Sequence, residues 1–295
     1  MRTRRLLAAT LVILSLTALT ACGARGDREP VVPEGTEVRT IEVDGVTREY
    51  RVHVPGDLSA DPALVVMLHG GFGSAAQAER AYGWDEASDA HGFVVAYPDG
   101  TSRTWNAGGC CGPSVRDDVD HVAFLSALVA ELQEEFGISP ERTFGTGMSN
   151  GAMMTYRMAC ETSVFHAIAP VAGTIVSDCD DPAPASVTHI HGAQDGMVRM
   201  DGERGTGTAQ VDGMPVEEAV ALWRAADSCP DPSAAVAGVV TNLTAVCPDG
   251  RTVTLLVISD AGHQWPGSDP REGAADQPST AFDATGLIWE FFDAS

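Results

Sequence analysis

The sequence contains no lysine: all 18 of its Lys and Arg residues are arginine, against 41 Asp and Glu, and the formal net charge of the 295 residues is -23. A chain with so little positive charge lacks the basic face that binds the phosphates of nucleic acid or the head groups of an anionic membrane. The hydrophobic fraction of 44% and the charged fraction of 20% lie near ordinary globular values, which argues against disorder. We therefore expect a folded, acidic protein that does not bind nucleic acid.

Charged side chains are also missing from residues 6–21, which follow three arginines within the first five positions. A charged start and a short apolar run are typical of an export signal, and the run is too short for a comfortable membrane span. The segment ends in Leu19-Thr20-Ala21-Cys22, which resembles the lipobox of bacterial lipoproteins. We predict a lipoprotein signal peptide over 1–21 and a lipid on Cys22, with an ordinary secretory signal as the alternative. The product is expected to be exported, and either anchored by its lipid to the outer face of the cell membrane or secreted.

Seven cysteines are many for a chain without an obvious metal motif. With one assigned to lipid, an even number remains, and in an oxidising compartment this predicts up to three disulfides. Local spacing favours Cys160 with Cys179 and Cys229 with Cys247, although the sequence allows other connections. The adjacent Cys110 and Cys111 are left over, and we take them as the third candidate pair. No pair has the C-x2-C spacing of a zinc site and no zinc pattern of histidines lies near, so we predict no metal.

Residues 22–36 are rich in Gly, Pro, Arg and acidic residues and indicate a flexible tether. Two segments with alternating apolar residues, 38–43 and 47–54, flank Asp44-Gly45, which predicts a β-hairpin. No internal repeat or second linker follows. We expect a single catalytic domain over 37–295.

Beyond the hairpin, short apolar runs alternate with amphipathic segments. The runs predict strands at 64–68, 93–97, 143–146, 167–171, 187–190 and 253–258. The amphipathic segments predict helices at 119–136, 152–159, 216–226 and 282–292. This alternation predicts an α/β fold, with a mostly parallel central sheet flanked by helices on both faces.

The segment Gly147-Met148-Ser149-Asn150-Gly151 lies between a predicted strand and a predicted helix. A serine on a tight strand-to-helix turn projects its hydroxyl into solvent, and glycine on each side allows the strained backbone. The helix N-terminus directs the backbone N–H of Asn150 toward a developing oxyanion. We predict Ser149 as a nucleophile and Asn150 as an oxyanion donor; a glycine-rich turn with a capping serine is the alternative.

A nucleophilic serine needs a general base, and in this fold class the chain order is Ser, acid, His. Four histidines follow Ser149, and His263 alone follows the region where an acid would lie. It stands in a loop directly after the last predicted strand. We predict His263 as the base and Asp195, which also follows a predicted strand, as the acid. Asp260 is the rival, although three residues from His263 it suits a turn better.

Two further histidines, His189 within the predicted strand at 187–190 and His191 directly after it, alternate along one extended segment. Residues two apart on a strand share one face of the sheet. For both we favour a place in the core or in supporting hydrogen bonds over a catalytic role.

A second oxyanion donor is expected in the glycine-rich segment His69-Gly70-Gly71-Phe72-Gly73-Ser74, which follows the strand at 64–68. Glycine there admits a backbone N–H close to a substrate oxygen. We predict Gly71 as the donor and Phe72 as the alternative, against a turn without substrate contact. The segment is neither a phosphate-binding nor a dinucleotide-binding motif, since no Gly-Lys-Ser/Thr follows and the spacing is not G-x-G-x-x-G.

The chain resembles the exported esterases grouped as polyhydroxybutyrate depolymerases and feruloyl or acetylxylan esterases, a set of α/β-hydrolases that includes lipoproteins. The matching segments spread over residues 64–292 and include Leu68-His69-Gly70-Gly71, Trp105-Asn106-Ala107-Gly108 with Cys110-Cys111-Gly112, Asp117-Asp118-Val119, Gly147 to Met154, His191-Gly192 with Asp195, and Gly262 to Gly267.

This resemblance implies an α/β-hydrolase fold and a serine carboxylesterase in which Ser149, Asp195 and His263 match the triad. Gly71 is similar in position to the family's oxyanion donor. The resemblance also implies that Trp105 and Trp265 line the cleft, with core aromatics on loops as the alternative. No metal or organic cofactor is expected.

The implied substrates are small-molecule or oligomeric esters of the short-chain, hydroxyalkanoate or feruloyl type. Soluble esters are favoured over solid polyester, because no linker or polymer-binding module follows the catalytic segments. A serine peptidase or an acyltransferase on the same fold is the second hypothesis. A catalytically inert, lipid-anchored surface protein is the third. The sequence does not predict the oligomeric state.

Overall fold

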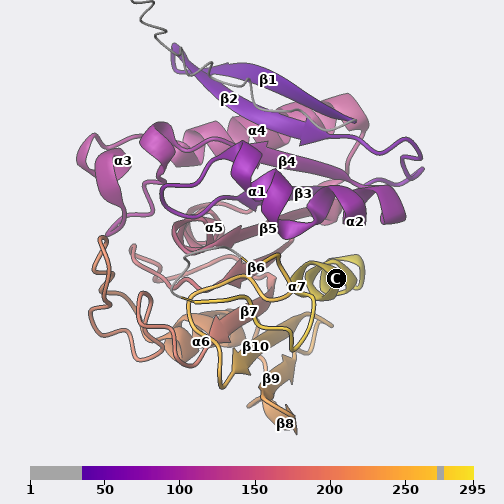
Figure 1. Cartoon of the computed structure of the whole chain (residues 1–295). Coiled ribbons are helices and arrows are strands. Elements are labelled where there is room, and N and C mark those ends of the chain that lie inside the picture. The colour runs from indigo at the N-terminus through magenta and orange to yellow at the C-terminus, as the bar shows by residue number, and fades with distance from the viewer. Residues whose placement is uncertain (1–34, 271–275) are drawn as a thin grey trace, which may run out of the picture. The chain divides into compact units, whose positions relative to one another are not determined.

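The computed structural model describes residues 35–270 and 276–295 (Figure 1). The predicted signal peptide over 1–21, the predicted lipid site Cys22 and nearly all of the predicted tether lie outside these residues. Within the described part of the chain, no helix is both long enough and apolar enough to cross a membrane.

The described strands include the predicted hairpin and every other predicted strand, and they add a second hairpin. Their bounds are β1 Thr36–Val43, β2 Val46–His53, β3 Leu64–Leu68, β4 Val94–Pro98, β5 Thr143–Met148, β6 Ala167–Val171, β7 Ser186–Gly192, β8 Ser233–Ala237, β9 Val240–Val246 and β10 Thr252–Ile258. The helices are α1 Ala75–Tyr82, α2 Trp84–His91, α3 Gly112–Arg116, α4 His121–Phe136, α5 Asn150–Glu161, α6 Val216–Ala226 and α7 Ala284–Asp293. Short 3-10 turns span Thr101–Arg103 and Pro140–Arg142.

The described strands form one sheet of ten, in the order β1-β2-β4-β3-β5-β6-β7-β10-β9-β8 (Figure 1). Its middle part, from β4 through β3, β5, β6 and β7 to β10, is parallel. Antiparallel hairpins close both ends, with β1 and β2 at one and β9 and β8 at the other. The predicted mostly parallel sheet is confirmed.

Helices pack on both faces of this sheet and bury its central strands on both sides. Along β3, Leu64, Val66 and Leu68 pack in the core formed with α4, α5 and α6. The alternate residues Val65 and Met67 pack in the second core, formed with α1, α2 and α7. The five side chains have no exposed surface. Burial on both faces explains why such strands are continuous apolar runs in the sequence.

The central strands end in register along one edge of the sheet. Leu68 at the end of β3 pairs with Gly147 of β5, and Met148 pairs with Val171 of β6. Farther along the sheet, Ile258 at the end of β10 pairs with Gly192 of β7. The loops that leave β3, β5, β7 and β10 therefore start side by side. This alignment brings the predicted functional residues to one edge.

The elements that the sequence did not predict are α1, α2, α3 and the β8–β9 hairpin. Helices α1 and α2 are single short segments of eight residues each, in which polar side chains interrupt the apolar period. All five residues of β8 are exposed at the sheet edge. An exposed edge strand needs no apolar face, and it therefore leaves no alternating pattern in the sequence.

Three disulfides join Cys110 with Cys111, Cys160 with Cys179, and Cys229 with Cys247. These are the two pairs that local spacing favours and the adjacent pair that they leave over, and the prediction is confirmed. Cys229 and Cys247 also lie beside Asp227 in the one group of metal-ligand type found among the described residues. Because the two sulfurs are bonded to each other, neither is available as a thiolate ligand.

The Cys160–Cys179 disulfide ties the end of α5 to the loop after β6 across 19 residues. Closing a loop of this length restricts the unfolded chain, so the variant Cys160→Ala/Cys179→Ala is expected to lose about 3 kcal/mol of unfolding free energy. Urea denaturation under non-reducing conditions measures the difference. A loss below about 1 kcal/mol would contradict the loop-closure account.

Candidate active site

Ser149 forms the whole turn between β5, which ends at Met148, and α5, which begins at Asn150. Its φ of 56° and ψ of -116° lie outside the regions that residues with a Cβ ordinarily adopt. The strained turn is held by two backbone hydrogen bonds: Ser149 N–H donates to Val171 O, and Met153 N–H donates to Ser149 O, both at 2.9 Å. The Ser149 side chain is partly exposed.

The two glycines around Ser149 allow a contact too close for any side chain. A Cβ on Gly151 would lie 2.1 Å from Leu68 O, at the end of β3. A Cβ on Gly147 would lie 2.6 Å from the Gly151 carbonyl carbon. Both distances are far below van der Waals contact, so α5 reaches the ends of β3 and β5 because these positions are glycine. The glycine spacing of the motif follows from this packing.

The predicted base and the predicted acid are hydrogen bonded to each other. His263 Nδ1 lies 2.7 Å from Asp195 Oδ2. The Asp195 side chain has no exposed surface, whereas 9% of the His263 side chain is exposed. Because a carboxylate only accepts, Nδ1 carries the proton and Nε2 of the neutral ring is left as the basic nitrogen.

Asp260, the rival acid, is exposed in the turn after β10. The described structure gives it no hydrogen bond to the imidazole. A different carboxylate, that of Asp276, accepts the backbone N–H of His263 at 2.9 Å. Asp276 thus fixes the main chain of the loop while Asp195 fixes the ring.

The Asp195 carboxylate is held by backbone donors as well as by His263. Its Oδ1 accepts the N–H groups of Met197 and Val198, each at 2.8 Å. His191 Nε2 lies 3.5 Å from Oδ2. Burial acts to raise the pKa of Asp195, but the hydrogen bond from His263, the electrostatic interactions with His263 and His191, and the Val198 N–H together lower it below its ordinary value. The carboxyl is therefore held as a carboxylate.

A buried chain of hydrogen bonds lies behind this carboxylate. Tyr156 OH lies 2.7 Å from His189 Nδ1, and His189 Nε2 lies 2.9 Å from His191 Nδ1. His191 Nε2 lies 2.8 Å from Val198 O, which accepts only, so each proton position follows: Tyr156 donates to His189, His189 to His191, and His191 to Val198. The favoured supporting role of the two histidines agrees with this chain, which braces the loop that carries Asp195.

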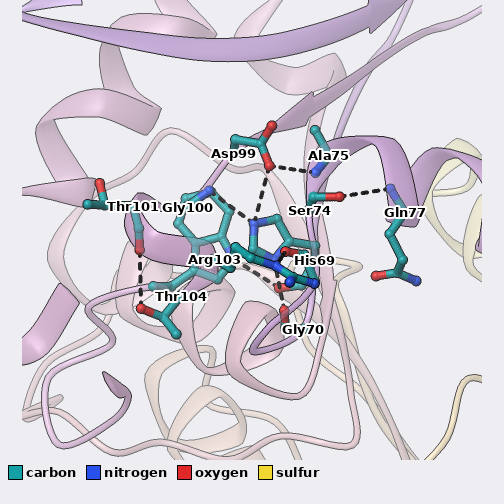
Figure 2. Close-up of polar contacts among 12 residues, drawn as sticks. His69, Gly70, Ser74, Ala75, Gln77, Asp99, Gly100, Thr101, Arg103 and Thr104 are labelled. Atoms are coloured by element: carbon teal, nitrogen blue, oxygen red, sulfur yellow. Dashed lines mark hydrogen bonds and ion pairs between the residues drawn. The ribbon is translucent and has the colours of Figure 1, made fainter. Parts of the chain in front are cut away.

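The loop Gly70–Gly73 lies beside the serine turn. A Cβ on Gly70 would lie 3.7 Å from Ser149 Cβ, and one on Gly71 would lie 3.7 Å from Asn150 Cβ. Gly70 O accepts the Gly73 N–H at 2.9 Å and is 2.8 Å from His69 Nδ1. Since His69 Nε2 accepts the Gly100 N–H at 3.0 Å, Nδ1 is the donor to Gly70 O (Figure 2).

These contacts distinguish between the two predicted oxyanion donors of the loop. The Phe72 N–H is already donated to Arg103 O at 2.8 Å. The Gly71 N–H has no acceptor among the described residues. Its direction is fixed, because the carbonyl of the same planar peptide, Gly70 O, is held by two donors on the opposite side. Asn150 is the first residue of α5, so its N–H has no acceptor within the helix.

Trp105 and Trp265 are buried, with exposed fractions of 0% and 2%. The Trp105 ring N–H donates to His69 O at 2.9 Å, and that of Trp265 donates to Thr285 Oγ1 at 3.1 Å. The main chain of Trp105 also bonds both ends of the Asn150 side-chain amide, at 2.7 and 3.1 Å. Burial favours the alternative of core aromatics over the implied lining of the cleft.

Ser149 and His263 are not hydrogen bonded to each other in the described structure. They leave the same edge of the sheet, from β5 and from the loop after β10, and the Ser–His contact stays a prediction. Arg103 and Asp276 are contacts that sequence reasoning missed. Neither stands in a recognisable motif, since each acts on a loop distant in the sequence.

The architecture and the strand-serine-helix turn define an α/β-hydrolase. Two solved structures share the fold: an acetyl xylan esterase from Aspergillus awamori, with a TM-score of 0.61 at 15% identity over 88% of this chain and 100% of that one, and a dienelactone hydrolase-like promiscuous phosphotriesterase from metagenomic libraries, with a TM-score of 0.57 at 14% identity over 88% and 97%.

Comparison of this sequence with those of known proteins shows that its relatives are esterases and depolymerases. "Putative esterase NocK" of Nocardia uniformis subsp. tsuyamanensis is 32% identical over 272 residues, which cover 82% of this chain and 77% of that protein. "Probable feruloyl esterase C" of Aspergillus niger is 27% identical over 68% of this chain and 73% of its own length. "Poly(3-hydroxyalkanoate) depolymerase C" of Paucimonas lemoignei is 35% identical over 41% of this chain, a stretch that spans 30% of that protein. No family model matches the chain.

The chain belongs to this family of α/β-hydrolase esterases, and it is a carboxylic ester hydrolase. The resemblance inferred from the motifs is confirmed.

Buried histidines make stability depend on pH. Burial lowers the pKa of His69, His121, His189 and His191, for His121 to about 3. The unfolded chain binds these protons below about pH 6.5 while the folded chain does not, so the stabilisation is complete above that pH and is lost as the pH falls.

We expect the free energy of unfolding to fall between pH 7.5 and 5.0, by up to about 1.4 kcal/mol per pH unit for each ring once the pH is below 6. Urea denaturation at a series of pH values measures the slope. The variant His91→Gln, which changes an exposed ring, should keep the slope. A stability that is constant over this range would contradict burial of the four rings in their neutral form.

Proposed function

We propose that the chain hydrolyses carboxylic esters through an acyl-enzyme, with Ser149 as nucleophile, His263 as general base and Asp195 as the supporting acid. The observation that carries this proposal is the 2.7 Å hydrogen bond between His263 Nδ1 and buried Asp195, at the sheet edge where β5 presents Ser149 on a strained turn. A carboxylate bound to one ring nitrogen keeps the other basic and directed outward.

In the first step, Ser149 Oγ attacks the carbonyl carbon of the ester while His263 Nε2 takes the hydroxyl proton. The imidazolium that forms is stabilised by Asp195. When the tetrahedral intermediate collapses, the bond to the alcohol oxygen breaks and the proton on Nε2 passes to that oxygen. The alcohol leaves and an acyl ester on Ser149 remains.

In the second step, His263 takes a proton from water, and the water oxygen attacks the acyl carbon. Collapse of this second intermediate breaks the bond to Ser149 Oγ, which recovers its proton from His263. The carboxylic acid leaves and the enzyme returns to its starting state. Every step uses side chains of this chain and water.

Both intermediates carry a negatively charged oxygen, which we assign to the N–H groups of Gly71 and Asn150. Among the described residues the Gly71 N–H has no acceptor, and its direction is fixed because Gly70 O of the same peptide is hydrogen bonded. The Asn150 N–H lies at the N-terminus of α5, where the helix dipole favours negative charge. Each donor of this kind is worth roughly 3 kcal/mol of transition-state stabilisation.

We propose short-chain, hydroxyalkanoate or feruloyl-type esters as substrates. Relatives are named for feruloyl esters and for poly(3-hydroxyalkanoate), and this supports the classes. The net charge of -23 favours neutral esters over anionic ones. A panel of acyl chain lengths, set beside feruloyl, acetyl-xylan and hydroxybutyrate oligomer substrates, tests the choice.

Replacing Ser149 with alanine removes the nucleophile, so kcat on p-nitrophenyl acetate or butyrate is expected to fall by about 10⁴-fold or more. The variant Ser163→Ala, which changes an exposed serine after α5, should keep wild-type turnover. Equal turnover by the Ser149→Ala variant would contradict the mechanism.

The wild type and the two serine variants also distinguish an esterase from a peptidase, an acyltransferase and an inert surface protein. A peptidase would cleave an aminoacyl anilide faster than the matching ester, and an acyltransferase would transfer the acyl group to an added alcohol in preference to water. An inert surface protein would leave Ser149 unlabelled by a fluorophosphonate probe, whereas we expect labelling of the wild type and of Ser163→Ala.

We further propose that the chain is exported and carries lipid on Cys22. The three disulfides of the described residues suit an oxidising compartment, which supports export. The motif Leu19-Thr20-Ala21-Cys22 supports lipidation.

A Cys22→Ser variant expressed in a bacterium should move from the membrane fraction and the detergent phase to the aqueous phase, because a diacyl anchor is lost. Esterase activity per molecule should stay at the wild-type level. Wild-type protein that is already in the aqueous phase would contradict the anchor and leave the esterase mechanism untouched.

A further inference from the structure

Arg103 lies in the short turn Thr101–Arg103 and reaches back to the Gly70–Gly73 loop, some thirty residues earlier in the sequence (Figure 2). Its Nε donates to Gly73 O at 3.1 Å, and its NH2 group donates to Phe72 O. Its own carbonyl accepts the Phe72 N–H at 2.8 Å. One residue therefore makes three hydrogen bonds to the two residues that follow Gly71.

The backbone on both sides of this contact is strained. Phe72, Ser102 and Arg103 have φ values of 62°, 51° and 63°, in the left-handed region that residues with a Cβ rarely adopt. Each such residue costs on the order of 1–3 kcal/mol and persists where neighbouring contacts hold it. Here the holding contacts are the three hydrogen bonds of Arg103.

The Thr101–Arg103 turn is itself held by hydrogen bonds. The Arg103 N–H donates to Gly100 O at 3.0 Å, and the Gly100 N–H donates to buried His69 Nε2 at 3.0 Å. His69 in turn precedes the Gly70–Gly73 loop directly. The loop and the turn thus form a closed ring of contacts, in which His69 holds one side and Arg103 the other (Figure 2).

The contacts of the Arg103 side chain differ from those of most other arginines among the described residues. Arg51, Arg116 and Arg157, for example, form ion pairs with carboxylates. Arg103 makes no ion pair among the described residues, in a sequence with 41 acidic residues. Its guanidinium N–H groups donate instead to two backbone carbonyls, those of Phe72 and Gly73. A guanidinium suits this task because it presents several donors in one rigid plane.

We propose that Arg103 is a positioning residue for the oxyanion site, an inference that rests on the proposed function. By holding Phe72 and Gly73, it keeps the Gly73 N–H on Gly70 O, and the planar peptide then directs the Gly71 N–H away from that carbonyl. Without the guanidinium, Phe72 is free to relax from its φ of 62° toward an unstrained value. Gly73 then loses its fixed place against Gly70 O, and the Gly71 N–H loses its fixed direction.

The direct test is Arg103→Ala, which removes the side-chain bonds and leaves the backbone acceptor. Because oxyanion donors act in the transition state, kcat on p-nitrophenyl butyrate should fall by about tenfold, less than the 10²–10³ for deletion of a donor, while KM stays within about twofold. The rate of inactivation by a fluorophosphonate should fall in parallel, since its phosphoryl oxygen occupies the same donors.

Two further measurements separate positioning from a general loss of structure. Added guanidinium ion should partly restore kcat of Arg103→Ala, and Arg103→Lys, with a single point of donation, should lie between the alanine variant and the wild type. Arg116→Ala is the matched control: its side chain is 71% exposed and pairs with adjacent Asp117, so kcat should be unchanged. Thermal unfolding of each variant confirms the fold.

The outcomes are distinct. Wild-type protein without esterase activity or fluorophosphonate labelling overturns the proposed function. An active wild type with an unchanged kcat in Arg103→Ala overturns the role of Arg103 alone. A raised KM with unchanged kcat also overturns it, because Arg103 would then bind the ground-state substrate and leave the oxyanion unaffected.

Discussion

Helix α5 packs so closely against the end of strand β3 that no side chain fits between them at Gly151, where a Cβ would lie 2.1 Å from Leu68 O. This contact brings together two segments that are far apart in the sequence: the turn that carries Ser149 and the loop that starts at His69. The proposed mechanism requires the nucleophile and the oxyanion donors to lie next to each other, and the glycine allows this approach. The proposed acid and base then have to lie beside this contact.

The parallel sheet brings the proposed site residues to one edge. Strands β3, β5, β7 and β10 end in register, so the loops with Gly71, Ser149, Asp195 and His263 leave the same edge. Burial would neutralise an isolated carboxyl, but the N–H groups of two following residues, the His263 ring and the nearby His191 keep Asp195 ionised. The negative charge that the proposed mechanism needs beside His263 is thus maintained inside the protein.

The central strands, the long helices and the serine turn could be predicted from the sequence because two-sided burial, helical periodicity and paired glycines each leave a local pattern. The choice of Asp195 over Asp260 followed from loop position and agrees with the hydrogen bond to His263. The edge hairpin of β8 and β9 and the short helices α1 and α2 leave no such pattern. Arg103 could not be found because it binds backbone carbonyls, which have the same chemistry at every residue, and Trp105 is buried by packing that no motif encodes.

If the Gly70–Gly73 loop and the Ser149 turn form one preorganised site, an inhibitor bound to Ser149 should already contact both proposed oxyanion donors. A crystal structure of the adduct with a p-nitrophenyl dialkyl phosphate measures this. We expect phosphorus bonded to Ser149 Oγ, with the phosphoryl oxygen about 2.7–3.1 Å from the N–H groups of Gly71 and Asn150. His263 Nε2 should face the same oxygen of Ser149. An adduct on another residue, or a phosphoryl oxygen directed away from both N–H groups, would contradict it.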